Sequence, residues 1–251
     1  MSNIKEIIEL DKILDFLWGD YHNITEENLI NKDSLERLGY FNHFGHQLCG
    51  PGYLSNSDVL SASSSGRFNG KTLDGGDVFF VPAACLNLYE PLFNESKGIN
   101  FTVLTSLTQV YRKEVFYDSY RRMNFWVREF VLFGKRNEID QCIEGITSRF
   151  LHSLSILKGT VTLQPATDSF VPNRFRHLLS DRQKQENAKL EFISSEANVS
   201  FGSINYHKQH FIKNFGLEEE GFETACIGIG LTRLNKLIKE NIIEVSNGNR
   251  N

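Results

Sequence analysis

The sequence ACIGIGLTR at residues 225–233 joins an apolar β segment to the last amphipathic helix of the chain, whose apolar residues recur at helical spacing through residues 231–238. The two glycines permit a close backbone approach at this strand-to-helix turn. Arg233 falls in the first turn of the helix, where a cation opposes the helix dipole. We therefore expect Arg233 either to contact an anionic or aromatic ligand or simply to be exposed to solvent.

Strand-like segments dominate the middle and the end of the chain, and they are expected at residues 78–81, 100–106, 109–114, 124–133, 190–194, 199–206 and 224–229. A long helix is expected over about residues 138–157, and the first 34 residues also have a helical pattern. Because few helices separate the strands, the order favours an α+β fold with a mostly antiparallel sheet rather than a regular βαβ alternation.

The composition is that of an ordinary globular protein of 251 residues, with 40% hydrophobic and 23% charged residues and 20 Phe that predict a core of large rings. We expect one domain over residues 1–251, with a helical segment at 1–34 and a long loop region at 45–76. The net charge of −4 disfavours a role that depends on phosphate contacts with nucleic acid.

Neither a membrane helix nor a secretory signal is expected, because the longest apolar stretch, residues 78–86, is far shorter than the ~18 residues that a membrane span needs. The four cysteines include no Cys-x-x-Cys pair, which argues against a zinc ribbon and a thioredoxin-like motif. A reduced, cytoplasmic protein is the expectation.

A basic motif closes one predicted strand and opens the next, with YRKE at residues 111–114 and RRMNF at residues 121–125. Arg112 and Glu114 are two residues apart on a strand, so their side chains share a face. A guanidinium binds phosphate in a bidentate manner, and a carboxylate on the same face can accept from an amine. A cross-strand ion pair on a solvated sheet face would have the same pattern.

Three possible metal ligands, Cys85, Glu129 and Cys226, each lie in or beside an apolar β segment. Two thiolates and one carboxylate would make a three-ligand zinc site with an open fourth position, which is typical of a catalytic zinc. The alternative is that the cysteines fill the core and that the glutamate is exposed. Their spacing alone does not decide between the two.

The chain resembles a known family through several motifs taken together. Residues 112–125 resemble motif 2 of class II aminoacyl-tRNA synthetases, and residues 228–233 resemble their motif 3. More specifically, the chain is similar to the seryl-synthetase-like amino acid:[carrier protein] ligases over about residues 34–240. The further matching segments are LERLGYF at 35–41, AC at 84–85, REF at 128–130, SINYH at 203–207 and TAC at 224–226.

The resemblance implies a class II catalytic domain, with an antiparallel sheet of six or seven strands flanked by helices. It also implies zinc held by Cys85, Glu129 and Cys226, with the α-amino group of the substrate in the open position. ATP would be bound by Arg112 at the α-phosphate, by Glu114 and Phe125 at the adenine, and by Arg233 on the other side of the adenine. Glu191 would help to hold Mg²⁺–ATP, and Asn205 would lie near the substrate.

The implied reaction is ATP-dependent activation of a small amino acid as its adenylate, followed by transfer to the phosphopantetheine thiol of a carrier protein. The family lacks a tRNA-binding arm, so tRNA is not an expected partner. A homodimer is the family arrangement, although motif 1, which builds it, is not recognisable in this chain. The alternatives are adenylation with another acceptor, namely tRNA, a peptide or a small amine, and a catalytically silent binding module.

Three further features bear on these alternatives. Motif 3 of the family has Glu before its Arg, whereas this chain has Thr232, which favours the silent module. His207 and His210 have a spacing that would suit a metal site on a helix, but without a third ligand nearby we expect a polar surface. The segment 174–189 holds five Lys or Arg residues against one Asp and one Glu, and such a segment could contact an acidic carrier.

Overall fold

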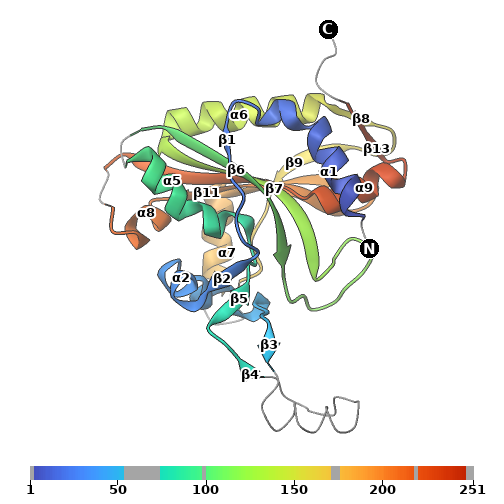
Figure 1. The fold of residues 1–251 in the computed structure, drawn as a ribbon. Helices are drawn as coiled ribbons and strands as arrows, with labels where there is room; N and C mark the ends of the chain where they lie inside the picture. The colour runs from blue at the N-terminus through green and yellow to red at the C-terminus, as the bar shows by residue number, and fades with distance from the viewer. Residues whose placement is uncertain (1–2, 54–73, 98–99, 171–175, 218–219, 247–251) are drawn as a thin grey trace, which may run out of the picture.

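A seven-stranded sheet forms the centre of the computed structural model, which describes residues 3–53, 74–97, 100–170, 176–217 and 220–246 (Figure 1). In spatial order, its strands are β1 (His22–Asn23), β6 (Thr102–Tyr111), β7 (Asn124–Lys135), β12 (Phe222–Ile229), β11 (Val199–Lys208), β10 (Lys189–Ser194) and β9 (Val161–Pro165). The edge strand β1 pairs with β6 in parallel, and the other strand pairs of this sheet are antiparallel.

The strand alternation divides the core into two layers, one on each face of the sheet. On β7, Phe130 and Leu132 belong to one buried cluster, whereas Val131 and Phe133 belong to the other. Three helices cover the first face, as Figure 1 shows: α1 (Ile4–Ile13), α6 (Arg136–His152) and α9 (Leu231–Lys239). The second face packs against the segments η3 (Ala84–Leu88), α5 (Tyr89–Ser96), α8 (His210–Asn214), α2 (Lys32–Arg37) and α3 (Tyr40–Phe44).

Shorter elements lie around the main sheet. They are the ribbons β8 (Leu154–Ile156) with β13 (Ile243–Val245), β2 (Leu29–Asn31) with β5 (Val78–Phe80) and β3 (Gly52–Tyr53) with β4 (Asp74–Gly75), the 3₁₀ turns η1 (Asp15–Leu17) and η2 (Gly45–Gln47), and helix α7 (Arg176–Gln185). Within the described ranges, no helix has both the length and the apolar character needed to cross a bilayer.

A buried ion pair attaches α1 to the sheet. The guanidinium of Arg128, which is only 2% exposed, donates from Nε to Asp11 Oδ1 at 2.9 Å and also contacts Asp11 Oδ2. A second donor on Arg128 binds Asn23 Oδ1 at 2.7 Å, and the guanidinium carbon lies 4.3 Å from the centroid of the Trp18 ring. Arg128 therefore joins α1 and β1 to β7 on the face opposite Glu129.

The predicted fold class, with a mostly antiparallel sheet flanked by helices, is confirmed, but several boundaries differ. Helical structure in the first 34 residues ends at Leu17 and resumes only at Lys32, because the chain between them forms β1 and β2 through pairing with distant strands. The predicted strands at 100–106 and 109–114 are replaced by one strand, β6, in which Ser106 and Thr108 form a 3.0 Å hydrogen bond with each other. Because β6 ends at Tyr111, Arg112 and Glu114 lie in the segment after the strand, and the prediction that they share a strand face is wrong.

Long-range pairing also shortens the predicted helix at 138–157. Helix α6 ends at His152, and residues 154–156 instead form β8 against β13. The predicted loop at 45–76 is described only at its two ends, where η2, β3 and β4 lie, and residues 54–73 are outside the described part of the chain.

Candidate functional site

Cys85, Glu129 and Cys226 lie together on the second face of the sheet. One ligand atom from each lies within 4.8 Å of the other two. Their side chains come from η3, β7 and β12, and the residues are 7%, 5% and 2% exposed, respectively. The interpretation that these cysteines merely fill the core beside an exposed acid is therefore wrong for Glu129, which is buried next to both sulfurs.

The strand register explains how Glu129 reaches the two cysteines. Glu129 pairs directly with Gly228, two residues beyond Cys226 on β12, so the carboxylate and the Cys226 sulfur share a face. A Cβ atom built on Gly228 would lie 2.7 Å from Glu129 Oε2 and 3.5 Å from Val127 Cγ1. Glycine at this position thus provides the space that the carboxylate occupies.

The electrostatics of this cluster favour a cation. Burial raises the pKa of Glu129 to about 7, although a hydrogen bond with Cys226 and the charge of Arg112 oppose the rise. A hydrogen bond with Cys85, followed by burial, raises the pKa of the Cys226 thiol well above its usual value. Three acidic groups buried this close together must either keep their protons or share a positive charge.

A buried hydroxyl without a partner lies close to the same cluster. The Oη atom of Tyr89 forms no hydrogen bond with any described residue, and Tyr89 is 0% exposed. Burial raises the pKa of this phenol, and the charges of Cys85, Cys226 and Glu129, together with an interaction between the hydroxyl and the Cys85 side chain, raise it further. The hydroxyl is therefore close to Cys85, although no contact there meets the geometry of a hydrogen bond. The donor set and this orphaned polar atom both fit a bound zinc ion with an additional polar ligand.

A second group of residues converges on the ring of Phe125. The guanidinium carbons of Arg112 and Arg233 lie 5.3 Å and 6.0 Å, respectively, from the centroid of that ring. Arg112 is fixed by a 2.6 Å hydrogen bond from its Nε to the carbonyl of Pro82. Arg233 donates to the carbonyls of Ser200 and Tyr120 at 2.7 Å and 3.1 Å. Both cations are therefore held in place by backbone oxygens.

The guanidinium of Arg233 is poorly compensated in this position. Burial lowers its pKa, and the neighbouring charges of Arg112 and Arg121 lower it further, against the opposing effects of Glu114 and Glu191. Two guanidinium groups beside one aromatic ring make a place where an anionic group and a planar ring could both be bound. Of the two readings of Arg233, a ligand contact fits this burial better than simple exposure.

The remaining predicted site residues occupy the same side of the sheet. The charges of Glu114 and Glu191 both raise the pKa of Arg233. Glu191 also forms an ion pair with Lys189 at 3.1 Å. Asn205, on β11, directs its Nδ2 toward the Cys226 sulfur at 3.5 Å. Asn205 thus lies beside the thiol–carboxylate cluster, whereas Glu114 and Glu191 lie near enough to Arg233 to act on its charge.

The sequence analysis placed His207 on a polar surface, and that prediction is wrong. Its Nε2 lies 3.3 Å from the Cys226 sulfur, and burial lowers its pKa to about 4. The signal that could have found it is its distance of two residues from Asn205, which puts both side chains on one strand face. His210, in contrast, is exposed, and its Nε2 lies 3.3 Å from Asn214 Nδ2 and 3.4 Å from the carbonyl oxygen of Leu38.

Thr232, which stands where the resembling family has Glu, has a structural role here. Its side chain is buried, and its Oγ1 accepts a 2.8 Å hydrogen bond from the backbone N–H of Trp126 on β7. The hydroxyl thereby fixes the start of α9 against the strand that carries Phe125 and Glu129. With Thr232 in this position, the Arg233 guanidinium carbon lies 6.0 Å from the centroid of the Phe125 ring.

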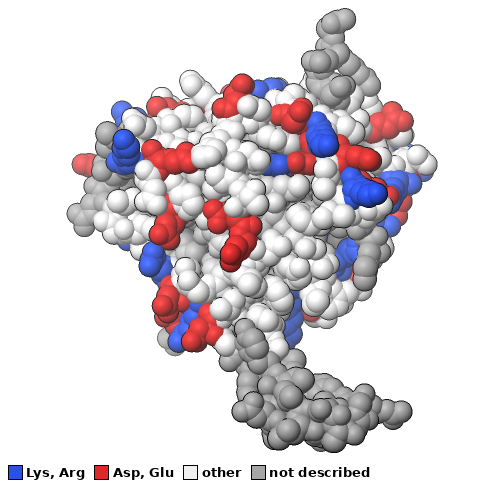
Figure 2. All heavy atoms as spheres, in the orientation of Figure 1, with Lys and Arg blue, Asp and Glu red and all other residues white. Residues whose placement is uncertain are grey.

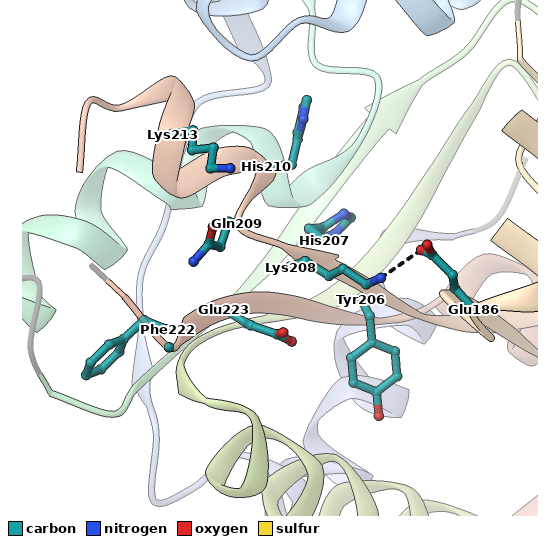
Figure 3. Close-up of a pocket in the computed structure, with 10 residues that line it drawn as sticks. Glu186, Tyr206, His207, Lys208, Gln209, His210, Lys213, Phe222 and Glu223 are labelled. Atoms are coloured by element: carbon teal, nitrogen blue, oxygen red, sulfur yellow. Dashed lines mark hydrogen bonds and ion pairs between the residues drawn. The ribbon is translucent and has the colours of Figure 1, made fainter. Parts of the chain in front are cut away.

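A cavity of about 590 Å³ opens beside this site, at the end of β11 and the start of β12. Figure 3 shows that His207 and Tyr206 leave β11 on opposite sides, while Lys208 forms its 2.7 Å ion pair with Glu186. His207 lines the cavity and also contacts Cys226, so it separates the cavity from the thiol–carboxylate cluster. On the face drawn in Figure 2, acidic and basic side chains are interspersed, in keeping with the net charge of −4.

Two curated proteins are similar to this chain in sequence. Both are from Bradyrhizobium diazoefficiens: amino acid–[acyl-carrier-protein] ligase 2 is 29% identical over 222 residues, and amino acid–[acyl-carrier-protein] ligase 1 is 26% identical over 223 residues. Each alignment covers 82% of this chain. The chain spans only 65% and 67% of the lengths of these relatives. No protein-family model matches the chain.

A solved structure shares the fold. A chain in the crystal structure of A. aeolicus tRNASec in complex with M. kandleri SerRS superposes with a TM-score of 0.70 at 21% identity, covering 92% of this chain and 51% of that one. The resemblance predicted from the motifs is thus confirmed: the chain has the fold of a class II seryl-tRNA synthetase and is similar in sequence to the amino acid–[acyl-carrier-protein] ligases.

Proposed function

We propose that this chain is a ligase that activates a small amino acid with ATP and transfers it to the phosphopantetheine thiol of a carrier protein. The observation that carries the proposal is the placement of two centres side by side: the cluster of Cys85, Glu129 and Cys226, and the Phe125 ring with Arg112 and Arg233. Arg112 lies near enough to Glu129 to lower its pKa, so the two centres could hold two parts of one substrate pair. The names of the two relatives support the acceptor.

The first step joins two anions. A carboxylate oxygen of the amino acid attacks the α-phosphorus of ATP, and the bond from that phosphorus to the bridging oxygen breaks, which releases pyrophosphate. Arg112 would neutralise the charge that develops on the α-phosphoryl oxygens. Phe125 and Arg233 would hold the adenine between them, with Glu114 at its edge, and would thereby align the phosphate for attack.

The proposed metal ligands would select the substrate. Cys85, Glu129 and Cys226 would hold Zn²⁺, which when bound supplies a Lewis acid with an open position for a neutral amine. The buried set then accepts an α-amino group and rejects a hydroxy acid. Asn205, directed into the same space, would contact the substrate, and Glu191 beside Lys189 would help to hold Mg²⁺–ATP.

In the second step, a thiolate attacks the acyl carbon of the adenylate, a thioester forms, and AMP leaves with the electrons of the broken acyl–phosphate bond. The segment 174–189 is our candidate for contact with an acidic carrier. Leu178 on α7 is 66% exposed there, amid the basic residues of the segment. The side chains of Arg176 and Arg182 are outside the described set.

Pyrophosphate exchange tests the first step. We expect exchange of labelled pyrophosphate into ATP when one small amino acid is added, in a screen of the twenty standard amino acids. The same amino acid should then form a thioester on a phosphopantetheinylated carrier, whereas transfer RNA or a small amine offered instead should remain unacylated. A protein that binds ATP and metal but exchanges with no amino acid would contradict the proposal and favour a silent binding module.

The carrier contact has its own test. Reversing Arg176 and Arg182 to Glu should reduce thioester formation and leave pyrophosphate exchange unchanged, because the proposal gives these two residues a contact with the carrier and none with ATP or the amino acid. Arg149→Glu, a reversal of the same sign on α6 across the sheet, is the matched control. Equal loss of both steps would count against this surface.

Homodimer formation stays a prediction, which light scattering coupled to size-exclusion chromatography would measure.

A further inference from the structure

An irregularity in β11 brings a second side chain onto Cys226. The β11–β12 ladder pairs Asn205 with Cys226 and Tyr206 with Ala225, and it then shifts so that the next pair is Lys208 with Thr224. His207 is the extra residue at this shift and has no partner in the ladder. Bulges of this kind redirect a side chain, and here the imidazole is directed to the sulfur that Asn205 already faces.

The contacts of His207 hold its ring in this position. Its Nε2 is 3.3 Å from Cys226 Sγ. The ring lies edge-on to Phe211, with centroids 4.9 Å apart, and edge-on to Tyr89 at 6.1 Å. Phe211 and Tyr89 are themselves stacked with centroids 3.9 Å apart. The imidazole therefore packs against the stacked rings of Tyr89 and Phe211, and its Nε2 faces the Cys226 sulfur.

We propose that His207 is a positioning residue, which donates a hydrogen bond from Nε2–H to the Cys226 thiolate and so sets the metal affinity of the cluster. This role rests on the proposed zinc site. The sulfur would receive two N–H donors, from His207 and from Asn205 at 3.5 Å. Outer groups that orient a ligand in this way contribute about 10–100-fold in metal affinity.

The chemical consequence concerns the open position at the metal. Two N–H donors stabilise the Cys226 thiolate over its thiol, which favours metal binding, and they also draw some charge from the sulfur. The cation then stays a better acceptor for a fourth ligand, here the substrate amine. His207 would thus orient the Cys226 sulfur and strengthen the binding of the substrate amine to the cation, without contacting the substrate itself.

Metal titration with two probe ions tests this role on the full chain. Zn²⁺ affinity is measured by competition with a chelator, and Co²⁺ reports the sulfur directly through its thiolate-to-metal charge-transfer absorption. His207→Phe keeps the packing against Phe211 and removes the N–H, and we expect about 10–100-fold weaker Zn²⁺ binding and a shifted charge-transfer band. His207→Gln, which restores a donor, should recover part of both.

The matched control is His210→Phe. His210 also packs against the Phe211 ring, with centroids 4.9 Å apart, but it bonds the Leu38 carbonyl rather than Cys226, so its replacement should leave affinity and absorption unchanged. Thermal unfolding of the metal-free variants checks that each is folded. If His207→Phe does not fold, His207→Gln and His207→Ala provide the comparison.

Two results would overturn the proposal, and they differ. Metal binding by the unaltered chain with the same affinity and absorption in His207→Phe would remove the role of His207 and leave the zinc site standing. Absence of Zn²⁺ and Co²⁺ binding in the unaltered chain would overturn the zinc site, and the role of His207 would fail with it.

Discussion

Arg112 and Arg233 lie far apart in the sequence, yet both guanidinium groups lie over the single ring of Phe125, with their carbons 5.3 Å and 6.0 Å from its centroid. Each is tied to a backbone carbonyl, so neither depends on a carboxylate partner to hold its place. Under the proposed function, these two fixed cations beside one ring would form a preorganised site for a phosphate joined to a planar base.

Removal of one of these cations should impair adenylation far more than folding. We expect Arg112→Ala to lower pyrophosphate exchange by about 10²–10³-fold, the usual loss when a preorganised charge donor is removed. Arg136→Ala, which removes a half-exposed guanidinium paired with Asp140 and Glu223, is the control. Exchange that survives intact in Arg112→Ala would show that this guanidinium does not face the nucleotide.

The thiol–carboxylate cluster should bind metal with a defined stoichiometry. We expect about one zinc ion per chain by elemental analysis, because three buried ligands form a single tetrahedral site with one open position. Cys226→Ser should lose that zinc, whereas Cys142→Ser, a change at a partly buried cysteine on the other face of the sheet, should retain it. Zinc retained in full by Cys226→Ser would place the metal elsewhere.

Gly228 should be needed to leave space for the Glu129 carboxylate, and not only for the strand-to-helix turn that follows it. In Gly228→Ala, the new methyl group would meet Glu129 Oε2 at 2.7 Å and displace it, so we expect loss of zinc together with about 1–3 kcal/mol of destabilisation from overpacking. Gly145→Ala is the control: a Cβ there meets nothing within 4 Å inside α6, and it should stabilise the protein by about 0.4–1 kcal/mol. Normal zinc content in Gly228→Ala would refute this account.

The Asp168–Lys189 pair should make stability depend on pH. Burial alone would raise the pKa of Asp168, but Lys189, at 2.6 Å, and Gln183 outweigh it and lower the pKa. A carboxyl with a lowered folded-state pKa stabilises the fold above its unfolded pKa, and that contribution is lost as the pH falls through the folded pKa.

The neighbouring ammonium responds in the opposite direction. Burial would lower the pKa of Lys189, yet Asp168 and Glu191 raise it, so its contribution is lost only as the pH rises through that raised value. We expect Asp168→Asn to lower the free energy of unfolding by about 1–3 kcal/mol at neutral pH. In acid, where Asp168 of the unaltered protein becomes protonated, the difference in free energy of unfolding between the two proteins should become smaller. Denaturant unfolding at several pH values measures both free energies of unfolding. A difference between them that grows in acid would contradict a lowered pKa for Asp168.

The sequence predicts part of the site. The alternation of β7 places Glu129 with Val131 and Phe133, and the alternation of β12 places Cys226 apart from Ala225 and Ile227. That the acid and the thiol share one face required the pairing of Glu129 with Gly228, which is a tertiary feature. The order of strands likewise indicated an antiparallel α+β sheet. What the sequence did not reveal was the contact between His207 and Cys226: alternation puts His207 on the face of Asn205, but the register shift beside it cannot be read from one strand alone.

By itself, the sequence determined the residue types, their side of each strand and the motifs that identify the class of fold. The tertiary structure alone decided that Cys85 lies within 4.8 Å of Glu129 and Cys226, that the region after Leu17 becomes strand, and that His207 turns onto a sulfur. The reason is physical: periodicity is a local property of the chain, whereas these three outcomes depend on pairing and packing between segments that only folding brings together.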